Sequence, residues 1–169
     1  MARTKTVVTE VYKFSELSEN AQDKAIQKLY DLNVDYEWWD SVYEDAKTIG
    51  LKLKGFDLDR HRHATGALTV SPLECIKLIL TNHGESCDTY KLAKDFEQAF
   101  TDFEASKNRE DDSFDQDEFD EAREDFEKAL LEEYSIMLQH EYEYLTSREA
   151  IVESIECNNY EFDEDGNLA

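Results

Sequence analysis

The residues whose chemistry suits a metal site are four histidines and three cysteines. His61 and His63 would point to the same side of a strand, as two zinc ligands require. Further ligands would have to come from His83, Cys75 or Cys87. No second ligand pair stands at a spacing that is diagnostic for zinc. The alternative is a basic surface loop, residues 60–63, that acts as a local charge partner for the acidic half of the chain.

A second run has the spacing of a calcium loop. Alternate positions carry oxygen side chains at Asp111, Ser113, Asp115 and Asp117. Gln116 occupies the position that needs glycine, and Ala122 the position that needs a bidentate glutamate, which argues against calcium. No nucleophile elbow, Walker loop, Rossmann glycine pattern or HExxH sequence is present. The sequence therefore predicts no enzymatic activity, no metal and no cofactor, with an unfamiliar metalloenzyme at His61 and His63 as an alternative.

Negative charge is unevenly distributed along the chain. The net charge is −23, and residues 1–80 hold 11 Lys and Arg against 13 Asp and Glu, whereas residues 81–169 hold 7 against 28. Such a field repels nucleic acid and anionic membranes and attracts basic protein surfaces. The alternative interpretation is that the charge serves solubility alone.

The acidic residues of the C-terminal half recur at helical spacing. Carboxylates three and four residues apart lie about 5 to 6 Å apart at their Cβ atoms, and duplex DNA carries one charge per roughly 1.7 Å of axis. A rigid row of this kind predicts a surface that mimics nucleic acid. The candidate row consists of Asp117, Glu118, Glu121, Glu124, Asp125, Glu127, Glu132 and Glu133.

Two adjacent tryptophans are the other candidate for partner binding. Trp38 and Trp39 diverge by about 100° if both are helical, so that one can be buried while the other is partly exposed. An exposed Trp39 near Tyr36 or Tyr43 would be a binding anchor. Half-buried packing is the alternative.

The pattern of apolar residues predicts elements that alternate between strand and helix in the N-terminal half. They are a strand over 5–14, a helix over 19–32 capped by Ser15 or Ser18, a helix from Asp35 ended by Gly50, a hairpin over 51–58 and 64–70, and a helix begun by Ser71 and Pro72. Helices dominate the C-terminal half. They comprise a helix from Ser86, a loop over 105–115, a long helix over 117–145, and a short helix capped by Ser147 and followed by an edge strand at 160–162.

These elements predict an α+β fold. About three strands of the N-terminal half form a small antiparallel sheet that packs with five to six helices, including a long acidic C-terminal helical hairpin. We expect a single domain over residues 1–169, with a near-neutral α/β half (1–84) and an acidic helical half (85–169).

Four runs of the sequence resemble a family of small acidic proteins encoded by phages and prophages, some of which are labelled antitoxin-like. The runs are YKFSELSENAQDKAIQKLYD, VDYEWWDSVYEDAKTIGLKLKGFDLDR, LTNHGESCDTYKLAKDF and EYEYLTSREAIVESIECNNYEF. The resemblance covers nearly the whole chain and implies a phage setting without catalytic residues. By analogy with small acidic phage proteins, it implies an anti-CRISPR or anti-restriction inhibitor of host immunity.

Charge and resemblance together predict a non-enzymatic interaction protein that binds a basic, nucleic-acid-handling host protein. The alternative is an antitoxin-like or regulatory module that acts through shape-specific contacts around Trp38, Trp39 and the basic loop. An odd number of cysteines without a CxxC pair favours a reducing compartment. No apolar run approaches the roughly 18 residues that span a bilayer, so we expect the host cytosol, no membrane and no direct nucleic acid. A monomer and a homodimer are equally compatible with the sequence.

Overall fold

The computed structural model describes residues 1–169 and divides into two compact units. One unit combines Met1–Trp38 with Glu141–Ala169, and the other is the continuous segment Trp39–His140. This division differs from the expected halves, 1–84 and 85–169. The two-piece unit holds 6 Lys and Arg against 16 Asp and Glu, and the continuous unit 12 against 25. The negative charge is therefore shared by both units, with net charges of −10 and −13.

The two-piece unit forms around the chain ends. Its elements are β1 (Tyr12–Lys13), the 3₁₀ turn η1 (Phe14–Glu16), α1 (Glu19–Lys28), α6 (Arg148–Cys157) and β4 (Glu161–Phe162). β1 pairs antiparallel with β4, with Tyr12 opposite Phe162. The buried core comes from both pieces and consists of Phe14, Leu17, Ala21, Ala25, Ile151, Ile155 and Phe162.

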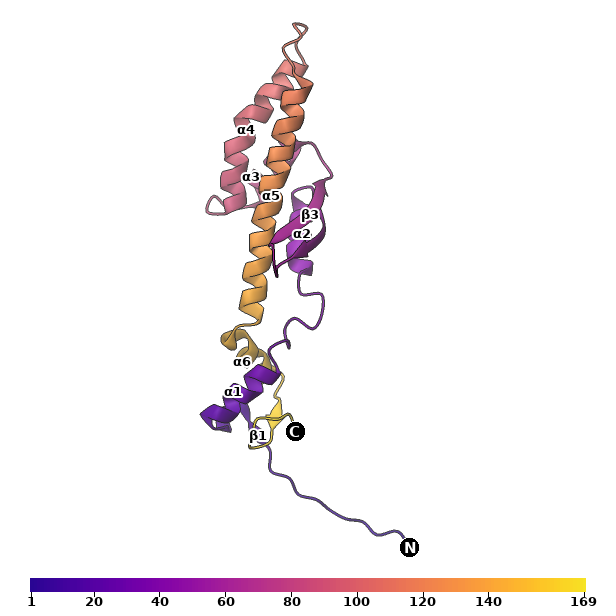
Figure 1. The fold of residues 1–169 in the computed structure, drawn as a ribbon, viewed down its shortest axis with the longest axis vertical. Coiled ribbons are helices and arrows are strands. Elements are labelled where there is room, and N and C mark those ends of the chain that lie inside the picture. Colours follow the sequence, from indigo (N-terminus) through magenta and orange to yellow (C-terminus); the bar gives the residue numbers. More distant parts are fainter. The chain divides into compact units, whose positions relative to one another are not determined.

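The predicted strand over residues 5–14 is wrong except at Tyr12 and Lys13. Residues 1–11 have no regular structure and extend away from the rest of this unit (Figure 1). Val7 and Val8 are 72% and 90% exposed. An alternating β-branched run gains stability only beside another strand, and β4 offers just two residues for pairing.

The continuous unit contains a β-hairpin and four helices. They are α2 (Asp40–Thr48), β2 (Leu51–Asp57), β3 (His63–Leu68), α3 (Pro72–Asn82), α4 (Asp88–Lys107) and α5 (Gln116–Leu145), of which the residues after His140 belong to the other unit. β2 and β3 pair antiparallel from Leu51 opposite Leu68 to Asp57 opposite His63. The hairpin and the α+β class are confirmed. The single sheet of about three strands is wrong, because four strands form two separate pairs.

Serine caps set three of the helix starts. Each hydroxyl accepts a hydrogen bond from the backbone N–H three residues further on, as a helix N-terminus requires; the pairs are Ser18 with Ala21, Ser71 with Glu74 and Ser147 with Ala150. Gly50 follows α2 with φ +79°, the left-handed conformation that glycine adopts without strain. α1 ends at Lys28 rather than near Leu32 and α2 begins at Asp40 rather than at Asp35, because turns and bends occupy most of residues 29–39.

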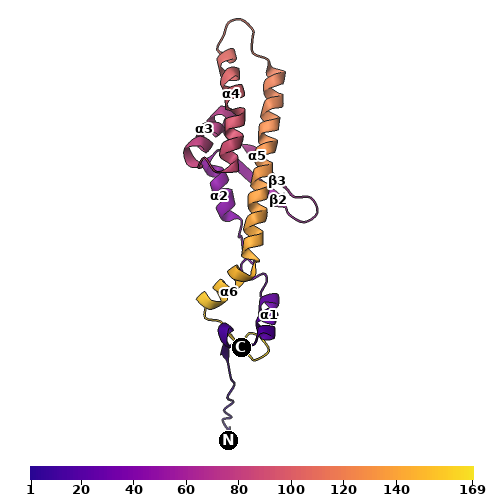
Figure 2. The ribbon, with the colours of Figure 1, turned by 90° about the vertical axis from the view of Figure 1, so that its left-hand side faces the viewer.

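α4 and α5 lie side by side and antiparallel, joined by the loop over residues 108–115 (Figures 1 and 2). Phenylalanines from both helices meet between them. The ring of Phe100 lies 5.7 Å from that of Phe126 and 5.9 Å from that of Phe119, and Phe103 lies 5.5 Å from Phe119, distances between ring centroids. The predicted helical hairpin is confirmed. No helix combines the length and apolar character needed to cross a membrane.

Candidate functional site

Five of the eight predicted carboxylates form a continuous exposed surface on the first turns of α5. We call Asp117, Glu118, Glu121, Glu124 and Asp125 the acidic row. At 100° per residue they occupy a sector about 120° wide. None of the five is in an ion pair within the chain. The acidic row therefore presents carboxylates that no ion pair neutralises, and Glu124 also lines a pocket with Arg62 and Lys128.

The other three predicted carboxylates lie outside this row, where two make contacts within the chain and one lines a cavity. Glu127 is half-buried, and its Oε1 lies 3.5 Å from Arg123 Nε. Glu132 is exposed but accepts a hydrogen bond from Arg62. Glu133 lies about 120° around the helix from Glu121, where it lines a cavity with residues of α2 and α4. The structure thus separates the predicted set of eight into the acidic row, two carboxylates paired with arginines and one that lines a cavity.

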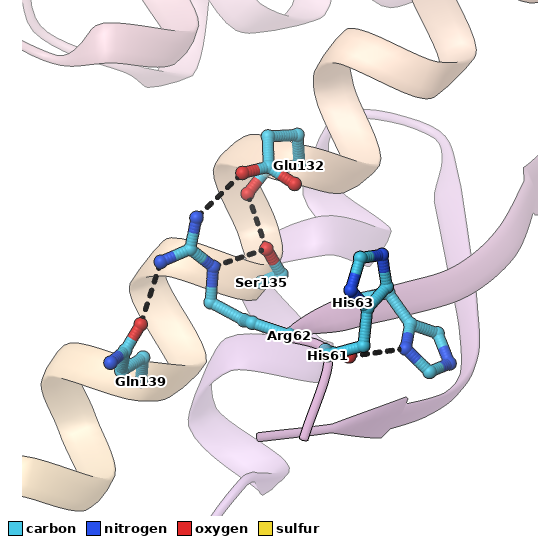
Figure 3. Close-up of polar contacts among 6 residues, drawn as sticks. All are labelled: His61, Arg62, His63, Glu132, Ser135 and Gln139. Carbon is cyan, nitrogen blue, oxygen red and sulfur yellow. Dashed lines mark hydrogen bonds and ion pairs between the residues drawn. The ribbon is translucent and has the colours of Figure 1, made fainter. Parts of the chain in front are cut away.

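Arg62, in the loop between β2 and β3, forms hydrogen bonds with three residues of α5 (Figure 3). Its Nη2 donates to Glu132 Oε1 at 2.6 Å, its Nη1 to Gln139 Oε1 at 2.7 Å and its Nε to Ser135 Oγ at 3.2 Å. The buried Ser135 hydroxyl in turn donates to the carbonyl of Glu132 at 2.7 Å. The expected pairing of the basic loop with the acidic half is confirmed for Arg62, and the fork-shaped guanidinium explains why one arginine reaches three acceptors.

The two histidines of this loop make a local contact. His63 Nδ1 lies 2.7 Å from the carbonyl oxygen of His61 (Figure 3). Nowhere in the chain do three or more His, Cys, Asp or Glu side chains come together in a way that would hold a metal ion. The structure therefore does not bring His83, Cys75 or Cys87 into a shared ligand set with His61 and His63.

The two tryptophans differ in burial, as expected. Trp38 is 9% exposed and packs with its ring centroid 5.5 Å from that of Tyr142. Trp39 is half-buried and precedes the first residue of α2, with its ring 5.8 Å from Phe56. Tyr43 also packs edge-on against Phe56. Trp39 therefore has the half-buried packing that was the alternative to an exposed anchor.

A polar network centred on Asp45 of α2 is absent from the sequence-based predictions. Tyr134, fully buried on α5, donates to Asp45 Oδ2 at 2.7 Å. His83 Nε2 lies 3.2 Å from the same oxygen but off the hydrogen-bond axis, so this is an electrostatic contact. His83 Nδ1 lies 2.6 Å from Thr89 Oγ1. No spacing signals this network, because its residues come from different elements far apart in the sequence.

The network holds an aspartate in a fixed, charged state. The contact with His83 lowers the pKa of Asp45, assisted by the hydrogen bond from Tyr134 and opposed by burial. Burial raises the pKa of Tyr134, and the hydrogen bond to Asp45 raises it further. His83 Nδ1 faces Thr89 and its Nε2 faces Asp45, so the contacts of this imidazole are with the network rather than with the thiol of Cys87. The arrangement orients Asp45 rather than activating a nucleophile.

The buried Cys75 is unsuited to nucleophilic chemistry. Cys75 is fully buried, and burial raises the pKa of its thiol to about 12. All three cysteines are free.

In comparisons with protein-family models, with curated proteins and with solved structures, nothing matched the chain.

Proposed function

We propose that the protein binds a basic, nucleic-acid-handling protein through the acidic row of α5 and thereby blocks the surface that receives nucleic acid. The carrying observation is that five exposed carboxylates share one helix face without an ion pair. The resemblance to phage-encoded acidic proteins supports a concrete form of this proposal, in which the partner is a CRISPR or restriction effector in the cytosol of the host.

The charge density of the acidic row supports this proposal in magnitude. Residues 117 to 125 span about 12 Å of helix, so the row carries about one negative charge per 3 Å. Duplex DNA carries one per roughly 1.7 Å. The acidic row thus reaches a little over half the linear charge density of DNA on a rigid scaffold, and like charges at this spacing cost helix stability. The phenylalanines between α4 and α5 offset that cost.

The test uses charge reversal with a matched control. Changing Asp117, Glu121 and Glu124 to Lys moves the net charge from −23 to −17, since each reversal adds two. Glu149, Glu153 and Glu156 on α6 are also exposed and have the same spacing. Changing these three to Lys gives an equal charge change on an equivalent helical stripe. Any difference between the two triple variants therefore reports position rather than total charge.

Tagged wild-type and variant proteins would capture partners from bacterial cytosol at low and at high salt, with and without duplex DNA. The proposal expects a nucleic-acid-binding partner that is released by salt and by DNA, is lost with the α5 variant and is retained by the α6 variant. Equal loss of partner binding with both variants would mean that binding depends on the net charge of the protein and not on the acidic row. A partner that resists both salt and DNA would favour the antitoxin-like module instead.

A further inference from the structure

The continuous unit contains a cavity of about 250 Å³ that is lined by three carboxylates, two imidazoles and apolar side chains. Asp45 of α2, Asp88 at the start of α4 and Glu133 of α5 supply the carboxylates. Ile136 and Met137 supply the apolar surface. Its volume lies just below the range of pockets for drug-sized ligands, about 300 to 1,000 Å³, and suits a single long side chain.

Few positively charged side chains of the chain lie near the carboxylates of this cavity. No lysine or arginine lines the cavity. The ammonium of Lys91 lies 3.9 Å from Asp88, and both side chains are largely exposed. Partial burial raises the pKa of Glu133, and the negative charges of Asp88 and Glu132 add to that effect. A carboxylate that is both desolvated and repelled by its neighbours is stabilised by a bound cation.

Asp45 is held in place to receive such a cation. Tyr134 and His83 both contact its Oδ2. The side chain of His83 lines the cavity and is 9% exposed, and its buried Nε2 has no aligned hydrogen bond in the chain. The side chain of Asp45 is 37% exposed, and its contacts with Tyr134 and His83 hold the carboxylate in one orientation. Such a fixed carboxylate is preorganised for binding.

We propose that this cavity receives the guanidinium group of an arginine side chain presented by a partner protein. A guanidinium is planar and weakly hydrated and has five donors in a fixed fork, so it can serve carboxylates on separate helices at once, whereas an ammonium is a compact, strongly hydrated charge. The aliphatic part of the arginine would lie on Ile136 and Met137. A metal ion does not fit, because the acidic and imidazole groups are not close enough together to coordinate one.

This inference does not rest on the proposed function of the acidic row. Glu133 faces away from that row, about 120° around α5 from Glu121, and the cavity is defined by burial and shape as well as by charge. Failure of the acidic row as a binding surface would leave the cavity with the same geometry. The two proposals are therefore tested separately, the row with a macromolecular partner and the cavity with a short peptide.

The experiment is an NMR titration of the full chain with three peptides that differ in one side chain: acetyl-Gly-Arg-Gly-amide, its citrulline counterpart and its lysine counterpart. Citrulline keeps the shape of arginine and removes its charge. We expect saturable shifts of the Ile136 and Met137 methyl signals with the arginine peptide, weaker binding of the lysine peptide and no saturable shift with citrulline. Equal binding of arginine and citrulline peptides, or no binding of any peptide, would overturn the proposal, and lysine binding as tight as arginine would overturn its guanidinium specificity.

Two isosteric variants localise the effect. Glu133→Gln removes one charge from the cavity and should weaken arginine-peptide binding about ten-fold, the lower end of what one charge-assisted hydrogen bond contributes. Glu121→Gln makes the same chemical change in the acidic row and should leave the affinity unchanged. If both variants weaken binding equally, the peptide senses only the overall field and the cavity is not its site. The dispersion of the amide spectrum shows that each variant is folded, and the peptide comparison in the wild-type chain does not depend on either variant.

Discussion

Arg62 is the side chain through which the β-hairpin is fixed to α5. Its three hydrogen bonds reach Glu132, Ser135 and Gln139, and its side chain is 35% exposed. We expect Arg62→Ala to lower the free energy of unfolding by about 1 to 2 kcal/mol, because charge-assisted bonds count for more than neutral ones but solvent screens the pair with Glu132. Urea denaturation followed by circular dichroism measures this difference.

Arg60 provides the control for that measurement. It belongs to the same loop, is exposed and forms no ion pair. Arg60→Ala removes the same charge and should change stability by less than about 0.5 kcal/mol. Similar losses in both variants would mean that the loop's positive charge, rather than the geometry of Arg62, stabilises the unit.

Asp45 gives the stability of the protein a component that depends on pH. Its pKa in the folded state is lowered below the ordinary value of 3.8, so the stabilisation is present above that value and is lost as the pH falls through the lower, folded pKa. Asp45→Asn should therefore be less stable than wild type by about 1 kcal/mol at pH 7, and the difference should shrink below about pH 4.

Denaturation curves at neutral and at acidic pH test this prediction. Asp125→Asn is the matched control, because Asp125 is exposed and its carboxylate forms no ion pair. Its difference from wild type should be the same at both pH values. A gap between wild type and Asp45→Asn that stays constant down to acid would show that the contacts with His83 and Tyr134 do not favour the charged carboxylate.

At the scale of elements, the α4–α5 hairpin depends on aromatic packing. Phe126 is fully buried, with its ring 5.2 Å from Phe96 and 5.7 Å from Phe100. Phe126→Ala should cost about 3 to 5 kcal/mol, the usual penalty for a large cavity in a core. Phe114 lies in the connecting loop and is only half-buried, so Phe114→Ala should cost clearly less.

Urea denaturation monitored by helical circular dichroism would compare the two phenylalanine variants. Equal losses would mean that the loop end of the hairpin is as tightly packed as its middle. The ring of Phe114 does touch those of Phe103 and Phe119, but part of its surface remains in contact with water, so less apolar area is lost on truncation.

At the scale of the whole molecule, the division into units makes a prediction about fragments. Residues 39–140 contain α2, the β-hairpin, α3, α4 and most of α5, with a core that includes Ile49, Ile76, Phe100 and Leu130. We expect this fragment to fold alone, with dispersed amide signals and cooperative unfolding. The fragment 85–169 keeps the acidic helices but loses the buried faces of α2, β2 and α3, so it should not fold cooperatively.

The two purified fragments would be compared by NMR and by thermal denaturation. Cooperative folding of residues 85–169 together with failure of residues 39–140 would contradict the structural division and return the boundary to the one expected from composition. The expected boundary was drawn from the distribution of charge along the sequence. The units are defined by contacts in space, and these join the two ends of the chain in one unit.

Local chemistry in the sequence by itself determined most helices and their ends. Ser18, Ser71 and Ser147 start helices through hydrogen bonds to residues three positions on, and Gly50 ends one through its backbone conformation. These signals depend only on near neighbours in the chain. The same holds for the hairpin and for the length of α5, whose apolar residues recur at a regular period.

The tertiary structure alone decided which residues act together. Whether residues 5–14 form a strand depends on a partner strand, and β4 pairs with only two of them. Whether Glu132 and Glu133 join the acidic row depends on the tertiary structure, because Glu132 accepts a hydrogen bond from Arg62 and Glu133 lines a cavity with residues of α2 and α4. The Asp45 network and its cavity combine α2, α4, α5 and the turn after α3. Long-range pairing of this kind leaves no periodic signal in a single sequence, because the distance between two residues along the chain does not fix their distance in space.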